Sequence, residues 1–166
     1  RRLQNIHEAI FEAIQEGVAS FKIFTTFRPI RVPYGHLWSI FAEVAKHGGI
    51  MAVHAEEDDV VTFMTDKLKA EGRAQGYNLH LVHNNLSEDL AFRHIIRLAG
   101  HTGAAVYFVH TTAKEGVAAV ASVAALRPPE RPRSLSGAHR AVAPLAPRPV
   151  RVSVGLEDAD DLLADM

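Results

Sequence analysis

The sequence predicts an α/β fold: a partial (β/α)8 TIM barrel of about three β/α units, followed by an irregular C-terminal tail. Short apolar runs at 18–24, 50–54 and 104–110 have the length and the bulky residues of buried strands, and a helical pattern follows each run. Strands that alternate with helices in this way pair in parallel through right-handed crossovers. A complete barrel usually needs about 250 residues, so we expect a chain of 166 residues to hold only part of one.

Periodicity, glycines and prolines predict the remaining elements of the first 126 residues. A first helix ends before Gly17, and a second ends at the Gly48–Gly49 pair. Two prolines mark 25–33 as a loop, and 72–85 is predicted to be a polar loop interrupted by glycine. The other predicted helices span 58–71, 87–102 and 113–126. Because the chain starts inside a helical pattern without an initiator methionine, we expect it to be cut at its front.

The character of the chain changes near Leu126. All five lysines precede this point, whereas six arginines and six of the eight prolines follow it. Prolines at this density disfavour both helix and sheet. We therefore divide the chain into a barrel fragment, 1–126, and a proline- and arginine-rich, then acidic, tail, 127–166. The tail is expected to be disordered or to derive from a shifted reading frame, with a strand near 150–154 and a short helix in 157–165 as alternatives.

Composition excludes several classes of protein and of site. With 18 basic and 19 acidic residues, the net charge of −1 gives no sign of a nucleic-acid or acidic-membrane partner. The absence of cysteine excludes disulfides and thiolate metal sites, which leaves histidine, carboxylate and modified lysine as ligands. No apolar run approaches the roughly 20 residues of a membrane span. The N-terminus lacks the pattern of a signal peptide, so a cytoplasmic location is expected.

Lys22, His54 and His110 each stand at the C-terminal end of a predicted strand, where β/α barrels collect their chemistry. A lysine among apolar neighbours is costly to bury in its charged form, so its pKa is expected to fall. The neutral amine can add carbon dioxide to give a carbamate, whose two anionic oxygens can bridge two divalent ions. Imidazoles from separate strands approach an ion from different directions, and neutral imidazole suits zinc. The three residues together therefore predict a metal site.

Each candidate also has a purely structural interpretation. A single histidine at a strand end is commonly a hydrogen-bonded core residue, and a single lysine is commonly a surface charge. Glu56 either orients a ligand or begins the next helix, and Thr111 either lies near the site or, with Thr112, caps a helix. Six of the other histidines divide into two groups. Four fall on helices or helix ends and are expected to be solvated: His36, His47, His94 and His101. Two lie in a loop and are candidates for substrate contact: His80 and His83.

Three stretches are shared with a known family: Gly17–Lys22, Val53–Glu56, and Tyr107–Thr111 followed by Ala113–Gly116. Through them, residues from about 17 to 126 resemble the cyclic amidohydrolases, most closely the dihydropyrimidinase and hydantoinase group. In that family the lysine is carbamylated and bridges two zinc ions, and the two histidines complete the shell of one ion. The resemblance therefore implies zinc as the cofactor, with Lys22, His54 and His110 as ligands at the ends of barrel strands four, five and six.

The chain departs from this family in three ways. The His-x-His pair that holds the family's first metal does not precede Lys22, and the catalytic aspartate would lie beyond the chain. Three acidic residues of the tail, Asp158, Asp160 and Asp161, match no motif. Phe27 occupies the position of a tyrosine that helps to stabilise the oxyanion, and it has no hydroxyl to donate. We thus expect this chain to hold at most one metal half-site and to lack the parent's aspartate base, so we assign no catalytic residue. Little or no activity is expected from this chain alone.

For the parent protein, the resemblance implies a homo-oligomer that hydrolyses C–N bonds of a small cyclic amide or ureide. A dihydroorotase- or allantoinase-type enzyme is the alternative within enzymes. A non-catalytic scaffold relative is a further alternative, although it would have little reason to keep the lysine and both histidines. Nucleic-acid binding by the arginine-rich tail is disfavoured, because no aromatic residue follows Leu126 and an acidic end balances the arginines.

Overall fold

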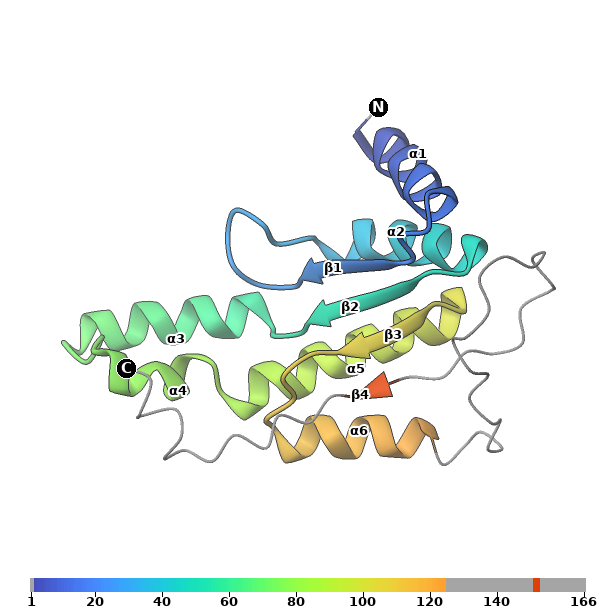
Figure 1. The fold of residues 1–166 in the computed structure, drawn as a ribbon. Helices are drawn as coiled ribbons and strands as arrows, with labels where there is room; N and C mark the ends of the chain where they lie inside the picture. The colour runs from blue at the N-terminus through green and yellow to red at the C-terminus, as the bar shows by residue number, and fades with distance from the viewer. Residues whose placement is uncertain (1, 125–150, 153–166) are drawn as a thin grey trace.

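A parallel sheet organises the chain (Figure 1). The computed structural model describes residues 2–124 and 151–152. Within them the sheet has four strands in the order β1 (Ser20–Phe24), β2 (Ile50–His54), β3 (Ala105–Phe108) and β4 (Arg151–Val152). All three pairings are parallel, with Phe24 opposite His54 and Val53 opposite Phe108. The predicted α/β class with parallel pairing is therefore confirmed, whereas the assignment of these strands to particular units of a barrel stays a prediction.

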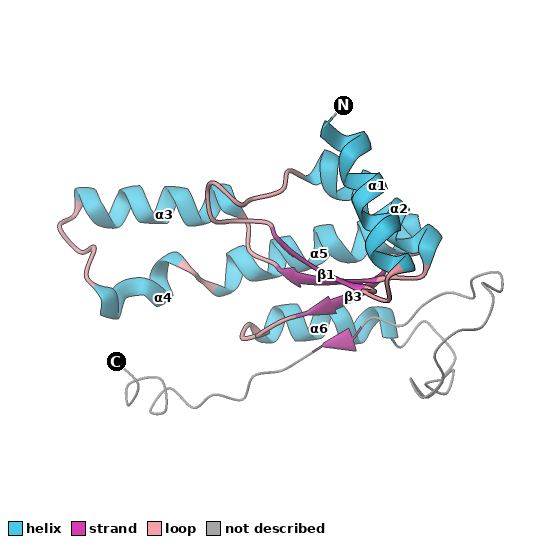
Figure 2. Cartoon of the chain, turned by 45° about the horizontal axis from the view of Figure 1, so that its top comes forward, coloured by secondary structure: helices cyan, strands magenta, loops and turns pink. Residues whose placement is uncertain are grey.

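Helices connect the strands in the predicted alternation. The helices are α1 (Arg2–Gln15), α2 (Tyr34–His47), α3 (Asp58–Ala70), α4 (Leu79–Val82), α5 (Asn85–Thr102) and α6 (Lys114–Ala124), with a 3-10 turn at Gly76–Asn78. Figures 1 and 2 show α3 and α4 side by side, extending past the C-terminal ends of the strands. In the described part of the chain, no helix has both the length and the apolar character needed to cross a membrane.

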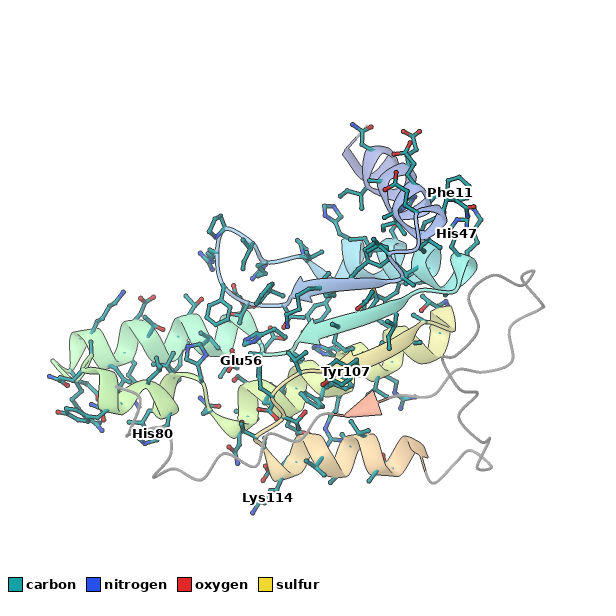
Figure 3. All side chains as sticks on the ribbon, viewed as in Figure 1. Phe11, His47, Glu56, His80, Tyr107 and Lys114 are labelled. Carbon is teal, nitrogen blue, oxygen red and sulfur yellow. The ribbon has the colours of Figure 1, made fainter. Side chains whose placement is uncertain are left out.

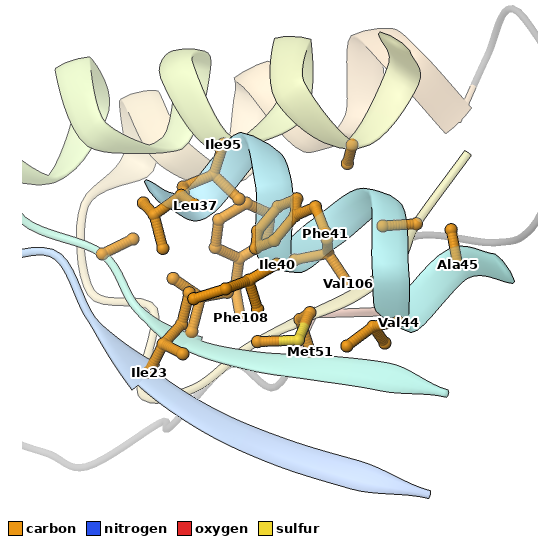
Figure 4. Close-up of a cluster of buried hydrophobic side chains, with 14 of the residues drawn as sticks. Ile23, Leu37, Ile40, Phe41, Val44, Ala45, Met51, Ile95, Val106 and Phe108 are labelled. Carbon is orange, nitrogen blue, oxygen red and sulfur yellow. The ribbon is translucent and has the colours of Figure 1, made fainter. Parts of the chain in front are cut away.

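The alternation of side chains along each strand separates two faces of the sheet. Ile23, Met51, Val53, Val106 and Phe108 are buried on the face covered by α2 and α5. There they pack with apolar residues of the two helices, among them Leu37, Phe41, Val44 and Ile95 (Figure 4). The intervening strand residues, which include Lys22, Phe24 and His54, therefore point to the opposite face.

Several predicted boundaries are wrong by one to a few residues. The third strand ends at Phe108 rather than at residue 110, so His110 lies two residues past it. The predicted loop 72–85 contains the 3-10 turn and α4. α5 begins at Asn85, two residues early, because the side chain of Asn84 accepts a hydrogen bond from the backbone N–H of Ser87 at 3.1 Å. Most of the predicted tail, 127–150 and 153–166, lies outside the described residues.

Candidate functional site

Two of the predicted site residues meet directly at the C-terminal ends of the strands. His54 Nδ1 lies 2.7 Å from His110 Nε2, and the two ring centroids are 4.4 Å apart. His54 is the last residue of β2 and is buried, whereas His110 is exposed in the segment that follows β3. The backbone of His110 has a positive φ of 38°, a conformation that a residue with a side chain rarely adopts. Strain of this kind commonly marks functional sites.

Lys22 lies on the same face of the sheet as His54, one strand away. Its Nζ is 4.7 Å from the ring centroid of Phe24, and that ring is 5.4 Å from the His54 ring. Partial burial lowers the pKa of Lys22, in the direction that the sequence predicts. Burial also lowers the pKa of His110, and its electrostatic interactions with His54 and Lys22 act in the same direction. Both shifts favour neutral nitrogen atoms with free electron pairs.

Glu56 joins a further histidine to this pair. Its Oε2 lies 2.9 Å from His54 Nε2 and 2.9 Å from His83 Nδ1. Glu56 stands between the end of β2 and the start of α3 (Figure 3). Burial acts to raise the pKa of Glu56, but the hydrogen bonds from His54 and His83 outweigh it and lower this pKa to about 2. The hydrogen bond with Glu56 raises the pKa of His83, although burial acts to lower it. The two shifts together favour an ion pair between Glu56 and His83.

Thr25 holds the backbone around Glu56. Its hydroxyl donates to the carbonyl of Glu56 at 2.6 Å, and it accepts from the N–H of Glu56 at 2.8 Å. The N–H of Thr25 donates to the carbonyl of His54 at 3.0 Å. Because these bonds join the ends of β1 and β2, they fix the direction in which His54 and Glu56 leave the sheet.

Phe27 covers the histidines from the loop that follows β1. Its ring centroid is 4.8 Å from that of His54 and 5.5 Å from that of His83. Like His110, Phe27 has a positive φ, here 69°. Within the described residues, these two are the non-glycine positions with positive φ, and both lie at this site. Phe27 therefore contacts two of the histidines, His54 and His83, whereas its role in a site stays a prediction.

A cavity of about 340 Å³ lies beside Phe27, between its loop and α3. Asp58 lines it and accepts hydrogen bonds from Thr26 at 3.0 Å, from Arg28 at 3.5 Å and from Arg31. His83 and Lys69 also line the cavity. The cavity thus lies between His83 and a surface with both acidic and basic side chains, among them Asp58 and Lys69.

Thr111 and Thr112 differ in their surroundings. Thr112 donates its hydroxyl to the buried carboxylate of Glu88 at 2.7 Å, and Glu88 also accepts from the N–H groups of Thr112 and Ala113. Glu88 therefore satisfies the first amides before α6, a structural role. Thr111 is buried, and its hydroxyl has no hydrogen-bond partner among the described residues.

The structure brings together five of the residues named from the sequence: Lys22, Phe27, His54, Glu56 and His110. His83 was predicted only as a candidate for substrate contact. Its contact with Glu56 joins residues 27 positions apart in the sequence, and no local pattern predicts such a contact. Among the other histidines, His36, His94 and His101 are exposed as predicted, whereas His47 is half-buried and contacts Glu43. Among the described residues, no group of three histidine, aspartate or glutamate side chains has the arrangement of a metal site.

No family model matches the chain, but known proteins do. It is 31% identical over 106 residues to a D-hydantoinase of Streptomyces coelicolor, a match that covers 63% of this chain and 23% of that protein. A D-hydantoinase of Ralstonia pickettii is 30% identical over 102 residues, which cover 61% of this chain and 22% of the relative. The chain thus spans about a quarter of the length of the relatives it matches.

Solved structures give the same result for the fold. A D-hydantoinase structure matches with a TM-score of 0.71 and 26% identity, over 74% of this chain and 27% of the other. The crystal structure of a dihydropyrimidinase from Brevibacillus agri matches with a TM-score of 0.71 at 22% identity, over 74% of this chain and 27% of the other, and supports the fold alone. These matches confirm the resemblance stated from the sequence.

Proposed function

We propose that this chain, a segment similar to the hydantoinase group of cyclic amidohydrolases, belongs to an enzyme that uses divalent metal to hydrolyse C–N bonds of cyclic amides. The observation that carries the proposal is the pair of facing nitrogens, His54 Nδ1 and His110 Nε2, at 2.7 Å. The name D-hydantoinase, which the relatives of 30–31% identity share, favours a hydantoinase-type substrate over that of a dihydroorotase or an allantoinase.

The residues present suit a metal ion. Two nitrogens bound to one tetrahedral zinc ion lie about 3.3 Å apart, because each lies about 2.0–2.1 Å from the metal. A rotation of either ring that opens the 2.7 Å contact by about 0.6 Å meets this requirement. Burial lowers the pKa of His110, and this direction favours the neutral ring that a metal ligand must have. Zinc is the metal that we propose, since both nitrogen donors are neutral imidazoles, which suit zinc.

Lys22 supplies the third donor in this proposal. Its lowered pKa increases the fraction of neutral amine, the form that adds carbon dioxide. The resulting carbamate is an anion with two oxygens, which suits a bridge between two ions in the parent protein. A metal ion held here would polarise the substrate carbonyl and activate water.

The other residues of the cluster act on the surroundings of the ligands. Phe27 covers His54 and His83 with an apolar ring and so limits access of water to them. It offers no hydrogen bond to an oxyanion, so that stabilisation has to come from groups other than this side chain. Thr25 fixes the backbone of His54 and Glu56.

The proposal extends to the architecture of the parent. We assign β1, β2 and β3 to strands four, five and six of a (β/α)8 barrel. The sheet face that carries Lys22 and His54 would then face the interior of that barrel. The whole protein's substrate is then a small cyclic amide, and its assembly into a homo-oligomer remains part of the same proposal.

Zinc content per chain tests the proposed site. We expect the purified 166-residue chain, after equilibration with zinc and removal of free metal, to retain about one zinc ion, as a single half-site implies. The double variant His54→Ala/His110→Ala is expected to retain none. The matched control is His36→Ala/His101→Ala, which removes two exposed histidines from α2 and α5.

Circular dichroism of all three proteins shows whether they remain folded. Equal zinc in both double variants, or a folded wild-type chain without zinc, would refute the metal site.

A further inference from the structure

His83 and Glu56 form a buried unit with His54 that the proposed metal chemistry does not itself require. The carboxylate of Glu56 is 12% exposed and lies between the side chains of His54 and His83, which are 11% and 24% exposed. Charged groups buried to this degree are stable only when they are paired and hydrogen-bonded. Both bonds of the unit, each 2.9 Å long to Oε2, have the length of a charge-assisted hydrogen bond.

The chemistry of a carboxylate determines which nitrogen of His54 carries the proton. An ionised carboxylate only accepts hydrogen bonds, so the Nε2 of His54 must donate to it. In a neutral imidazole the other nitrogen, Nδ1, then has a free electron pair. That nitrogen is the one that faces His110 at 2.7 Å.

His83 holds the carboxylate in place from the other side. Its Nδ1 lies 3.0 Å from Oε1 and 2.9 Å from Oε2 of Glu56, so it donates between the two oxygens. The short helix α4 and the cap at Asn84 place His83 at this point of the chain. Phe27 packs over both imidazoles and limits access of water to the hydrogen bonds. The carboxylate is thus fixed in position as well as in charge.

We propose that Glu56 and His83 are a positioning pair that holds His54 in its Nε2–H tautomer, so that Nδ1 is presented toward His110 as a donor to a cation. Glu56 acts on the ring directly, and His83 acts through Glu56. The role in cation binding rests on the proposed function, whereas the tautomer is a property of the metal-free chain. Outer hydrogen bonds of this kind commonly change metal affinity by about 10–100-fold.

Nitrogen-15 NMR of the histidine rings in the full metal-free chain tests the tautomer. In the wild-type chain we expect His54 to carry its proton on Nε2. In Glu56→Leu, which removes the acceptor and keeps an apolar side chain of similar size, we expect a mixture of tautomers or the Nδ1–H form. Glu56→Gln provides a milder change, since its one carbonyl oxygen can accept from only one of the two imidazoles.

Zinc affinity of the same proteins tests the consequence. We expect Glu56→Leu to weaken binding by about 10–100-fold and His83→Phe to weaken it less. His83→Gln retains an N–H donor and is expected to restore affinity close to that of the wild type. His80→Gln is the matched control. His80 is exposed, bonds to the carbonyl of Tyr77 at 3.0 Å, and lies on the outer side of α4, apart from Glu56 (Figure 3).

The outcomes separate this inference from the proposed function. If the wild-type chain binds no zinc but the tautomer of His54 depends on Glu56, the proposed metal site fails and the positioning role stands. A wild-type His54 protonated on Nδ1, or a tautomer unchanged in both Glu56 variants, overturns the inference whatever the zinc result. If Glu56→Leu does not fold, Glu56→Gln and the two His83 variants decide the matter by the same measurements.

Discussion

Lys22 combines an exposed position with a lowered pKa, and both follow from its place on β1. It lies on the strand face that the helices leave open, with its ammonium against the ring of Phe24. Partial burial there penalises the charged form. Because Lys22 is exposed, we expect its charge to contribute little to the stability of the fold.

Replacing Lys22 should therefore separate stability from metal binding. We expect Lys22→Met to change the free energy of unfolding by less than about 0.5 kcal/mol, because the methionine keeps the apolar stem. The same variant should weaken zinc binding about tenfold or more, since it removes a proposed ligand. Urea titration and isothermal calorimetry measure the two quantities. Lys46→Met, at a position 67% exposed on α2, is the control, and equal zinc affinity in the two variants would exclude Lys22 from the site.

The sequence predicts the site only where a local pattern marks a residue. Lys22, His54 and His110 are recognisable because each ends or follows an apolar run of strand length. His83 is not, because its partner Glu56 is 27 positions away and is reached through the irregular segment before α5. The positive φ of Phe27 and His110 is likewise a product of tertiary contacts, which no periodicity reports.

Among the elements, the turn between α2 and β2 shows most clearly why particular residues are required. Gly48 has a φ of 84°, and its N–H donates to the carbonyl of Ala45, so it ends α2 in the left-handed conformation. A Cβ on the next residue, Gly49, would lie 2.9 Å from Val44 Cγ1 and 3.1 Å from the carbonyl oxygen of Ala19. The turn is therefore tight at the point where the chain enters the sheet.

We expect Gly49→Ala to lower the free energy of unfolding by about 1–3 kcal/mol, because backbone and side chain would both have to move. Gly100→Ala is the matched control. A Cβ at Gly100 meets nothing within 4 Å, and alanine in a helix interior is favoured over glycine by about 0.5–1 kcal/mol. Chemical denaturation of both variants gives the two changes, which should have opposite signs. A Gly49→Ala variant as stable as the wild type would contradict this packing.

Glu43 of α2, which lies away from the candidate site, allows a test of how pH affects the stability of the fold. Burial acts to raise its pKa, but hydrogen bonds from His47 at 2.7 Å and from Lys46 at 3.4 Å outweigh it, so this pKa lies below its ordinary value of 4.5. A carboxyl group whose pKa is lowered by folding stabilises the fold above its unfolded pKa and loses that contribution as the pH falls.

We expect Glu43→Gln to be less stable than the wild type by about 0.5–1 kcal/mol at pH 6. The difference should shrink progressively below pH 4.5, as the wild-type carboxyl also becomes neutral. Urea titrations at pH 6, 4.5 and 3 measure it. A difference that is constant with pH would mean that the charge of Glu43 plays no part.

Element boundaries show what periodicity misses. The three main strands and the helices that connect them were predicted, because strands and helices have different apolar periods. α4 was not, since its four residues are too few to show a period. The predicted start of α5 is two residues late, because the side chain of Asn84 caps the helix and so begins it at Asn85.

For the whole molecule, one apolar layer between the sheet and the helices α2 and α5 carries the fold. Phe41 is fully buried in it, and the rings of Phe92 and Phe108 stack there at 3.9 Å with an interplanar angle of 14°. This layer leaves the opposite face of the sheet to Lys22 and His54. The separation of a buried face from an open face was predictable from the alternation of side chains along each strand. Which helix residue packs against which strand residue was not predictable in this way.

Removing one large side chain from this layer should affect the entire domain. We expect Phe41→Ala to lower the free energy of unfolding by about 3–5 kcal/mol, a large share of the 5–15 kcal/mol typical of a domain. Phe63→Ala, at a position 65% exposed on α3, is expected to change it by less than about 1 kcal/mol. Thermal denaturation compares the two, and similar losses would contradict the core described here.

The central claim is that His54 and His110 bind one metal ion together. X-ray absorption at the zinc edge of the zinc-loaded chain tests it most directly, because it reports the ligands of the ion itself. We expect two imidazole nitrogens at about 2.0–2.1 Å from zinc in the wild type, one in His110→Ala, and two in the His101→Ala control. A spectrum without imidazole, or one that His110→Ala leaves unchanged, would contradict the account.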